Sequence, residues 1–188
     1  MQYTKRQSRA WIIAGICVMG LVLAVGGFYV FSRKTSVAIC PYQQALHRPF
    51  IKKFFHDNWY WLVSEYSTDF SLDYILDNMV STNHPEYAKP LTIAVLCKKN
   101  DPIGFIAYHL ADKDEGKVLF VGVLKQERGH HHARRLLEHA FVELKKMGCK
   151  SVSLVTRTTN VSAQETYKAV GFSESGHENE FVNFVRVL

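Results

Sequence analysis

The sequence predicts a mixed α/β fold around one sheet, preceded by a single transmembrane helix. Residues 10–31 carry no charged side chain, and about 20 apolar residues are enough to span a bilayer as a helix. Further along, short apolar runs of strand length alternate with segments whose apolar residues recur at helical spacing. We therefore expect a short basic tail over residues 1–9, a transmembrane helix over 10–31 and one folded domain over 36–188.

The apolar run over residues 10–31 is best explained as a membrane anchor. Basic side chains border it on both sides, namely Lys5, Arg6, Arg9, Arg33 and Lys34. The alternative is a cleaved signal peptide with residues 22–24 as its small-residue exit. The apolar run continues past that site and a basic stop follows, which favours the anchor. Because basic residues lie at both ends, the positive-inside rule gives no orientation.

Charge and cysteine content narrow the function classes. The net charge of +6 fits either a solvated surface with basic membrane flanks or a site for an anionic ligand or lipid headgroup. We expect no nucleic-acid partner, because no basic run interleaves with aromatic residues. Cys40, Cys97 and Cys149 follow the apolar run without CxxC spacing. This odd number, near apolar residues, predicts buried free thiols and a reducing compartment rather than disulfides.

A short strand and an aromatic-rich helix are expected to open the domain. The strand covers residues 35–39 and ends at Cys40 and Pro41. Residues 42–60 then carry aromatic residues at helical spacing, with Pro49 breaking or restarting the helix. Three roles are open for the aromatic cluster near the end of this helix: lining a pocket, docking on the bilayer surface or filling the core. Core filling is the expectation, and the cluster comprises Phe54, Phe55, Trp59, Tyr60 and Trp61.

A second helix is expected over residues 69–80, where apolar residues gather on one side. Asp69 or Ser71 is its N-cap, because both side chains accept hydrogen bonds from free backbone N–H groups. Residues 81–90 follow as a loop.

Three strands then form a meander. Residues 91–97 and 103–110 are strands by their apolar content, and the turn between them, residues 98–102, has the composition of a hairpin. A second such turn over residues 112–116 leads into the third strand, whose apolar run covers 118–124. The domain is therefore expected to centre on this sheet.

The third strand feeds a glycine-containing turn over residues 128–133 and then an amphipathic helix. One face of that helix is apolar, with Ala133, Leu136, Leu137, Ala140, Phe141 and Leu144. Gly148 is expected to end the helix, and a strand, another helix and a terminal strand near 181–187 complete the chain. The free N–H groups and the positive dipole at the helix start make the turn a cradle for an anion.

Two motifs in this half of the chain carry a family resemblance. The first, (Arg/Gln)-x-x-Gly-x-(Gly/Ala), aligns with residues 128–133, where His131 replaces the inner glycine. The second, Asn-x-x-Ala-x-x-x-Tyr-x-x-x-Gly-Phe, is present in full as Asn160, Ala163, Tyr167, Gly171 and Phe172. On these motifs the chain resembles the GNAT superfamily of acetyl-CoA-dependent N-acetyltransferases from about residue 36 to 188. The resemblance implies a mostly antiparallel central sheet flanked by helices.

The resemblance further implies that acetyl-CoA binds along the turn as the acyl donor. Its pyrophosphate would be held by backbone amides at the helix start, those of Gly129, His130, His131, His132 and Ala133. Arg128 and Arg134 would add positive charge, and the backbone of Val123 would pair with the pantetheine arm. Asn160 would contact the same arm or cap the last helix, and these two roles are compatible. His131 stands where the family has a glycine that lets the backbone approach the pyrophosphate.

Tyr167 is the catalytic residue that the resemblance indicates. A phenol with a pKa of about 10 can protonate the thiolate that leaves when an amine attacks a thioester. The alternative for Tyr167 is a core aromatic residue. No general base is assigned. Many family members place an acid or a histidine on the fourth or fifth strand of the domain. Here the position on the fifth strand, which follows Gly148, falls on Val155, and the fourth strand, with the apolar run 118–124, has no carboxylate. His109, His84 and Glu86 are the candidates, and a water chain is the alternative.

No metal site is expected at the three adjacent histidines, His130 to His132. Consecutive helical residues point about 100° apart, so their rings cannot converge on one ion. Solvated or phosphate-facing histidines fit the pattern better.

These observations together predict an enzyme that transfers an acetyl group from acetyl-CoA to a primary amine while tethered to a membrane. The acceptor is an amine-bearing small molecule or a protein or peptide. The catalytic domain is expected to face a compartment that contains acetyl-CoA, most simply the cytoplasm. The alternative is a catalytically inactive acyl-CoA-binding or scaffold protein of the same fold, favoured by the missing strand carboxylate and the lost glycine. A third reading is a transferase for longer acyl chains at the membrane.

Overall fold

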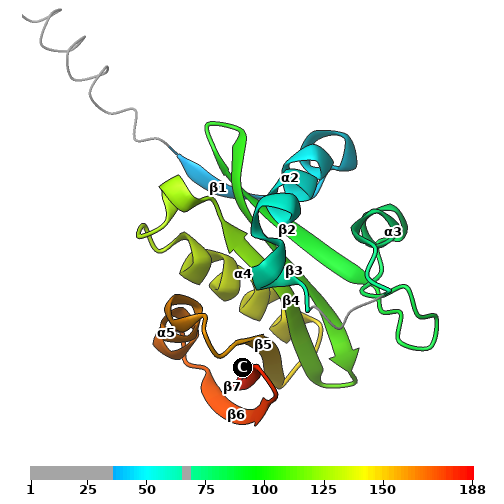
Figure 1. Cartoon of the computed structure of the whole chain (residues 1–188), viewed down its shortest axis with the longest axis vertical. Helices are drawn as coiled ribbons and strands as arrows, with labels where there is room; N and C mark the ends of the chain where they lie inside the picture. Colours follow the sequence, from blue (N-terminus) through cyan, green and yellow to red (C-terminus); the bar gives the residue numbers. More distant parts are fainter. Residues whose placement is uncertain (1–35, 65–68) are drawn as a thin grey trace, which may run out of the picture. The chain divides into compact units, whose positions relative to one another are not determined.

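The computed structural model describes residues 36–64 and 69–188, and the compact unit within them runs from Val37 to Leu188. Its centre is a seven-stranded sheet of order β1-β2-β3-β4-β5-β7-β6 (Figure 1). Neighbouring strands are antiparallel except β4 and β5, which pair in parallel. The expected mostly antiparallel sheet is therefore confirmed. The strands are β1 (Val37–Pro41), β2 (Leu91–Lys98), β3 (Asp101–Asp112), β4 (Glu115–Val123), β5 (Ser151–Arg157), β6 (Ser173–Glu178) and β7 (Phe181–Val187).

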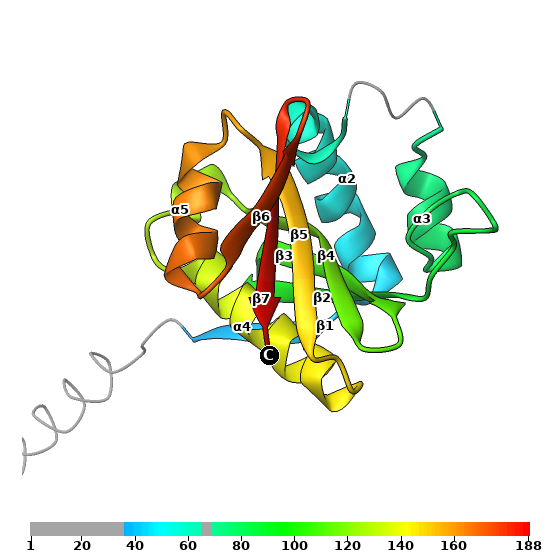
Figure 2. The same ribbon diagram turned by 90° about the horizontal axis from the view of Figure 1, so that it is seen from below.

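Helices cover both faces of this sheet, so the domain has three layers. Figure 2 shows α2 and α3 on one side of the strands and α4 and α5 on the other. The helices are α2 (Gln44–Leu62), α3 (Leu72–Asn78), the 3-10 turn η1 (Lys125–Glu127), α4 (His132–Lys146) and α5 (Val161–Ala169). Each layer buries its own apolar cluster against the sheet. Phe54, Phe55 and Leu76 belong to the α2–α3 side, and Leu136, Leu144 and Tyr167 to the α4–α5 side.

The amphipathic helix expected after the turn is confirmed as α4. The apolar face that the sequence indicated is buried from Leu136 to Leu144. Gly148 follows the helix with φ +94°, a conformation that costs a glycine little. Its N–H donates to the carbonyl oxygen of Lys145 at 3.0 Å, and the N–H of Cys149 donates to that of Leu144 at 3.1 Å. These bonds satisfy carbonyl groups that the helix end would otherwise leave free.

The two helices on the other face differ in detail from the expectation. Pro49 lies inside α2 and does not break it; the residue with non-helical φ and ψ is Asn58. The second helix is shorter than residues 69–80. It starts after Ser71, whose Oγ accepts a hydrogen bond from the N–H of Tyr74 at 3.2 Å, and ends at Met79 in the left-handed region. Of the two expected caps, Ser71 is therefore the right one.

The turn between β2 and β3 is a hairpin, as its residues predicted. Lys99 and Asn100 both have positive φ, 52° and 75°, which matches the twist of a two-residue hairpin connection. The terminal part of the chain corrects the expectation, because β6 precedes β7 and pairs with it. The sequence of β6, Ser-Glu-Ser-Gly-His-Glu, is mostly exposed at the sheet edge and so lacks the apolar alternation that reveals a half-buried strand.

Some expectations concern residues 1–35, which lie outside the described residues. The basic tail over residues 1–9 and the transmembrane helix over 10–31 belong to them. Within residues 36–64 and 69–188, no helix has the length and apolar character needed to cross a membrane. The three cysteines of this part, Cys40, Cys97 and Cys149, are free thiols, as predicted. Cys97 and Cys149 are buried as expected, whereas Cys40 is half-buried.

Candidate active site

The candidate site arises where β4 and β5 part from each other. Their parallel pairing covers only residues Glu115–Lys117 and Ser151–Ser153. Beyond these pairs β4 remains bonded to β3, and β5 to β7. The sheet therefore opens between the later parts of the two strands, and the opening is continued by a cavity of about 1040 Å³.

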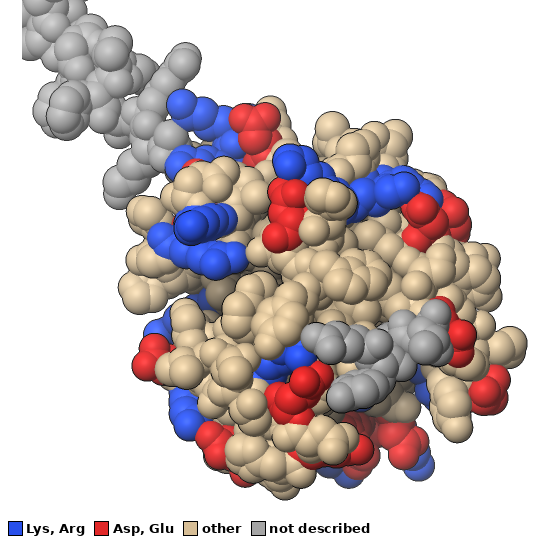
Figure 3. Space-filling view, in the orientation of Figure 1, with Lys and Arg blue, Asp and Glu red and all other residues tan. Residues whose placement is uncertain are grey.

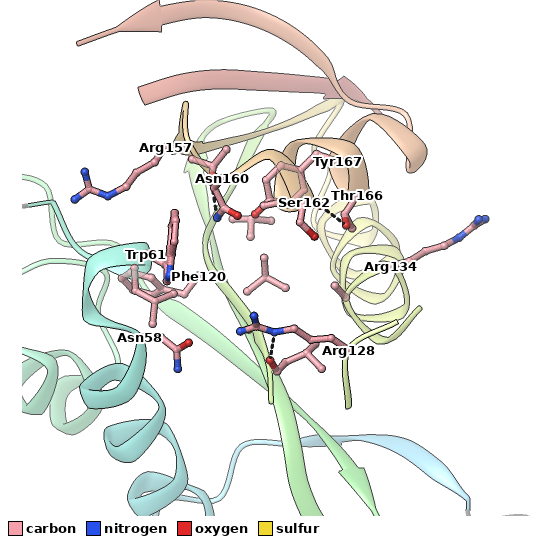
Figure 4. A pocket seen from close by; sticks show the side chains of 18 of the residues that line it. Asn58, Trp61, Phe120, Arg128, Arg134, Arg157, Asn160, Ser162, Thr166 and Tyr167 are labelled. Carbon is pink, nitrogen blue, oxygen red and sulfur yellow. Dashed lines mark hydrogen bonds between the residues drawn. The ribbon is translucent and has the colours of Figure 1, made fainter. Parts of the chain in front are cut away.

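Residues from seven elements of the described chain line this cavity, among them Glu127 of η1 and Phe181 of β7. Its floor is β4 from Lys117 to Val123, and its other sides are the end of β5, the helix α5, the start of α4 and the end of α2. Figure 4 shows Tyr167 and Asn160 across the hollow from Arg128, with Trp61 and Asn58 closing a third side. The cavity is thus bounded on the α4–α5 side by the two sequence motifs, and on the α2 side by residues that neither motif contains.

The start of α4 forms an electropositive end of the cavity. Gly129 and His131 to Arg134 line it, and the first N–H groups of a helix lack intrahelical acceptors. Gly129 and His131 both have positive φ, +80° and 59°. A side chain in this region is strained, although histidine tolerates it better than most residues. The backbone conformation of His131 is therefore one that favours glycine, the residue found at this position of the family motif.

Arg128 and Arg134, expected to add charge, are placed differently. The Nε of Arg128 donates to the carbonyl oxygen of Val123 at 3.2 Å, at the end of β4 and inside the cavity wall. Arg134 also belongs to the wall, but its guanidinium points away from the hollow (Figure 4) and its Nε lies 2.7 Å from Oε1 of Glu138. Of the two, Arg128 is better placed for an anion in the cavity.

The three histidines of the turn do not act as one group. His131 and His132 line the cavity, and His130 lies outside its wall. The ring of His130 stacks on that of His132 with centroids 5.8 Å apart. Within the described residues, no group of three or more His, Cys, Asp or Glu side chains could hold a metal ion.

Tyr167 is brought to the cavity from α5. The residue is 7% exposed, lines the cavity, and packs its ring against Phe172 and Phe184 at centroid distances of 6.0 and 5.8 Å. Burial raises the pKa of its phenol to about 12, because removal from water disfavours the phenolate. The phenol is therefore protonated near neutral pH, as a proton donor must be.

Asn160 precedes α5 and makes no capping hydrogen bond with its side chain. Instead, Nδ2 donates to Oγ1 of Thr156 on β5 at 3.3 Å, and both residues line the cavity. The alternative role as an ordinary side-chain cap is thus not observed. The carboxamide is held at the opening between β5 and α5.

The aromatic cluster at the end of α2 divides between core and cavity. Phe54 and Phe55 are buried, whereas Trp59, Tyr60 and Trp61 are about half exposed. The expectation of core filling therefore holds for the two phenylalanines alone. Phe54 and Trp61 line the cavity, which makes pocket lining the observed role of Trp61.

Arg157 is a cavity residue that the sequence reasoning missed. It ends β5, is 3% exposed and lines the cavity. Its Nη1 lies 2.7 Å from Oε1 of Glu180, and its Nη2 donates to the carbonyl oxygen of Val63 at 3.3 Å. The sequence did contain a sign of this role, because Arg157 ends an apolar strand and lies three residues before the second motif.

None of the candidate bases reaches the cavity wall. His109 is buried on β3, and His84 lies 3.3 Å from Asp69 and 3.7 Å from Glu86 at the surface. Two carboxylates do line the cavity, those of Glu127 and Glu165. The carboxylate of Glu127 lies 2.9 Å from Nζ of Lys98, and Glu165 is exposed on α5.

Positive and negative side chains are mixed on the face of the molecule shown in Figure 3. In the face shown in Figure 3, Lys and Arg side chains lie among Asp and Glu, without a continuous basic stripe. This face therefore offers no extended basic surface for an anionic partner.

The sequence profile of the acetyltransferase (GNAT) family matches residues 50–172. No curated protein matches the chain. Solved structures with the same fold include the PaiA N-acetyltransferase from Thermoplasma acidophilum in complex with coenzyme A, at 14% identity and a TM-score of 0.64, covering 81% of this chain and 99% of that one. Another is a GNAT family acetyltransferase from Elizabethkingia anophelis with acetyl-CoA bound, at 14% identity and a TM-score of 0.59, covering 82% of this chain and 100% of that one.

A third similar structure is the ribosomal-protein-S18-alanine N-acetyltransferase from Escherichia coli, at 17% identity and a TM-score of 0.57, covering 81% of this chain and 94% of that one. At these identities the likeness concerns the fold, and the family follows from the sequence profile, which spans more than half of the chain. The chain belongs to the acetyltransferase (GNAT) family and is an acyltransferase.

Proposed function

We propose that this protein transfers the acetyl group of acetyl-CoA to a primary amine, with the cavity between β4 and β5 as the active site. The observation that carries the proposal is the buried phenol of Tyr167, which lines the cavity opposite Arg128 (Figure 4). A neutral phenol at this place can donate a proton to a leaving thiolate.

The cavity residues fit a CoA thioester. Free N–H groups and the helix dipole at the start of α4 favour the pyrophosphate, and the guanidinium of Arg128 adds charge beside them. The exposed backbone edge of β4 near Val123 and the carboxamide of Asn160 lie along the same cavity and would hold the pantetheine arm. We assign CoA binding to these residues and to the Gly129–Ala133 turn.

The thioester is the acetyl donor, the amine is the nucleophile, and Tyr167 is the proton donor to the leaving group. Attack by the amine forms the amide bond and breaks the C–S bond. Tyr167 donates its phenol proton to the departing sulfur. The proton lost by the amine leaves through water, because no carboxylate of the described cavity wall is both enclosed and unpaired.

We further propose that the domain is tethered to a membrane by residues 10–31 and faces the cytoplasm. The uncharged run with basic residues on both sides supports the tether, and the supply of acetyl-CoA supports the orientation. Protease treatment of intact cells and of opened vesicles tests this. Digestion of the domain from outside intact cells would contradict the orientation, and recovery of the full chain in the soluble fraction would contradict the tether.

The alternative to amine acetylation is an inactive acyl-CoA-binding protein. The strained His131 favours it, as does the lack of a carboxylate on the part of β4 that lines the cavity; Glu115, at the start of β4, lies outside that part. Calorimetry with acetyl-CoA, followed by a thiol-release assay across amines of several classes, separates the two. We expect saturable binding and thiol release that depends on the amine. Binding without turnover on any amine would overturn the enzyme reading. Acetyl-, butyryl- and palmitoyl-CoA as donors test whether a longer acyl chain is preferred.

A further inference from the structure

Lys117 occupies the closed end of the cavity, where β4 and β5 are still paired. It lies opposite Ser153 of β5 and opposite His109 of β3, and it lines the cavity. Its neighbour Gly116 faces α4, because a Cβ there would lie 2.7 Å from Leu144. Successive strand residues point to opposite faces, so Lys117 points to the α2 side, away from the helices that carry both motifs.

The ammonium of Lys117 has no counter-charge among residues 36–64 and 69–188. The side chain is half-buried, yet no carboxylate lies within ion-pair distance and no hydrogen bond is made in this part of the chain. The nearest acid along the strand, Glu115, accepts a hydrogen bond from Oγ of Ser153 at 2.7 Å. Partly buried charges are normally paired, so Lys117 is a site at which an anion would be stabilised.

The imidazole of His109, across the strand pair from Lys117, is a second unsatisfied group. His109 is 8% exposed, and neither ring nitrogen has a hydrogen-bond partner among the described residues. A buried polar group without a partner is rare and costly. His109 does not line the cavity, so it supplies no carboxylate or other acceptor that would neutralise Lys117, and Lys117 alone faces an anion there.

The other charged side chains that line the cavity on this side, Arg157 and Glu127, are paired with residues other than Lys117. Arg157 is bound to Glu180 and to two carbonyl groups. Glu127 is bound to Lys98 at the far end, next to α4. A positively charged acceptor would therefore meet Lys117 without a compensating carboxylate, whereas an acceptor with an anionic group would be attracted to it.

We propose that the acceptor carries an anionic oxygen group, a carboxylate or a phosphate, in addition to its amine, and that Lys117 binds this group in the cavity. The inference rests on the proposed amine acetylation. It narrows the acceptor to molecules such as amino acids, peptides with a nearby carboxylate, or aminoalkyl phosphates.

Matched pairs of amines test the anionic subsite by binding, independently of turnover. The probes are alanine and alaninamide, phenylalanine and phenylalaninamide, and aminoethyl phosphate and ethanolamine, titrated by calorimetry into the CoA-saturated protein. We expect the anionic member to bind about tenfold more tightly in at least one pair, the effect of one charge-assisted hydrogen bond. Equal binding in all three pairs would overturn the inference; the acid pairs and the phosphate pair distinguish the two anions.

One variant and one matched control locate the effect. In Lys117→Gln the preference for the anionic member should fall to within about twofold, and in Lys113→Gln, an exposed lysine of the neighbouring hairpin, it should persist. A preference that survives Lys117→Gln would overturn the assignment. Absence of thiol release with every amine would contradict the proposed function and leave the binding comparison decisive for the subsite.

Discussion

Arg157 holds the end of α2 against the sheet through Tyr60. Its Nε donates to the carbonyl oxygen of Tyr60 at 2.6 Å, and the centre of its guanidinium lies 4.1 Å from the centroid of the Tyr60 ring. The two residues are 97 positions apart in the chain. Because Trp61 and Val63 follow Tyr60 and line the cavity, this contact positions the α2 side of the active site.

Replacing Arg157 should loosen that wall. In Arg157→Lys the charge is kept, but a single ammonium cannot stack on Tyr60 and also satisfy two carbonyls and Glu180. We expect the free energy of unfolding to fall by about 2–4 kcal/mol in urea denaturation. Arg135→Lys, at an exposed position of α4, should change it by less than about 0.5 kcal/mol. Equal effects of the two variants would show that Arg157 has no special role.

A glycine on β4 makes room for the core of the α2 side. A Cβ at Gly122 would lie 2.5 Å from the ring of Phe54, which is buried and lines the cavity. Gly122→Ala should therefore force the ring to move and lower the free energy of unfolding by about 1–3 kcal/mol. In Gly176→Ala, where the nearest atom is 4.0 Å away, little change is expected. Thermal denaturation of both variants would show whether the close approach matters.

His131 should be replaceable by glycine with a gain in stability. Its φ of 59° is unfavourable for a side chain and neutral for glycine. After subtraction of the greater freedom of glycine in the unfolded chain, we expect His131→Gly to raise the free energy of unfolding by about 0.5–1 kcal/mol. Ala133→Gly in the first turn of α4 should lower it instead. A loss of stability in His131→Gly would mean that the imidazole makes a stabilising contact.

The parts of the site that the sequence predicted are those with a local signature. The turn before α4 and the α5 motif are contiguous segments, so the resemblance to the family motifs was enough to place Gly129, Asn160 and Tyr167 on the proper elements. The α2 side depends on contacts between residues far apart in the chain, such as Arg157 with Tyr60. Spacing along one segment carries no information about such pairs.

The errors in the fold have the same origin. The polar edge strand β6 was missed because its stability comes from pairing with β7, not from an apolar face of its own. Pro49 was expected to interrupt a helix by its missing N–H, and packing of buried Ile51 and Phe55 on the sheet outweighs this local cost. Tertiary contacts thus override local preference in both cases.

The buried imidazole of His109 should make the protein sensitive to acid. Burial, together with the charges of Lys117 and Lys89, lowers its pKa from 6.5 to about 4. Between these values the unfolded chain binds a proton that the folded chain does not, so stability is lost as pH falls through this window. From neutral pH to about pH 5, the loss from this residue is about 2 kcal/mol. Urea denaturation at both pH values should show a smaller loss in His109→Leu; an unchanged loss would place the acid sensitivity elsewhere.

Tyr167 offers the sharpest test of the chemistry. Tyr167→Phe keeps the ring contacts with Phe172 and Phe184 and removes only the proton donor. We expect kcat to fall by at least about 100-fold, with the Kd for acetyl-CoA unchanged within about twofold. Tyr108→Phe is the matched control, because Tyr108 is also buried, also has a pKa raised to about 12, and lies outside the cavity wall; its kcat should stay near that of the native enzyme. If both variants kept full activity, Tyr167 would be a core aromatic residue and the proton would reach the thiolate from another group.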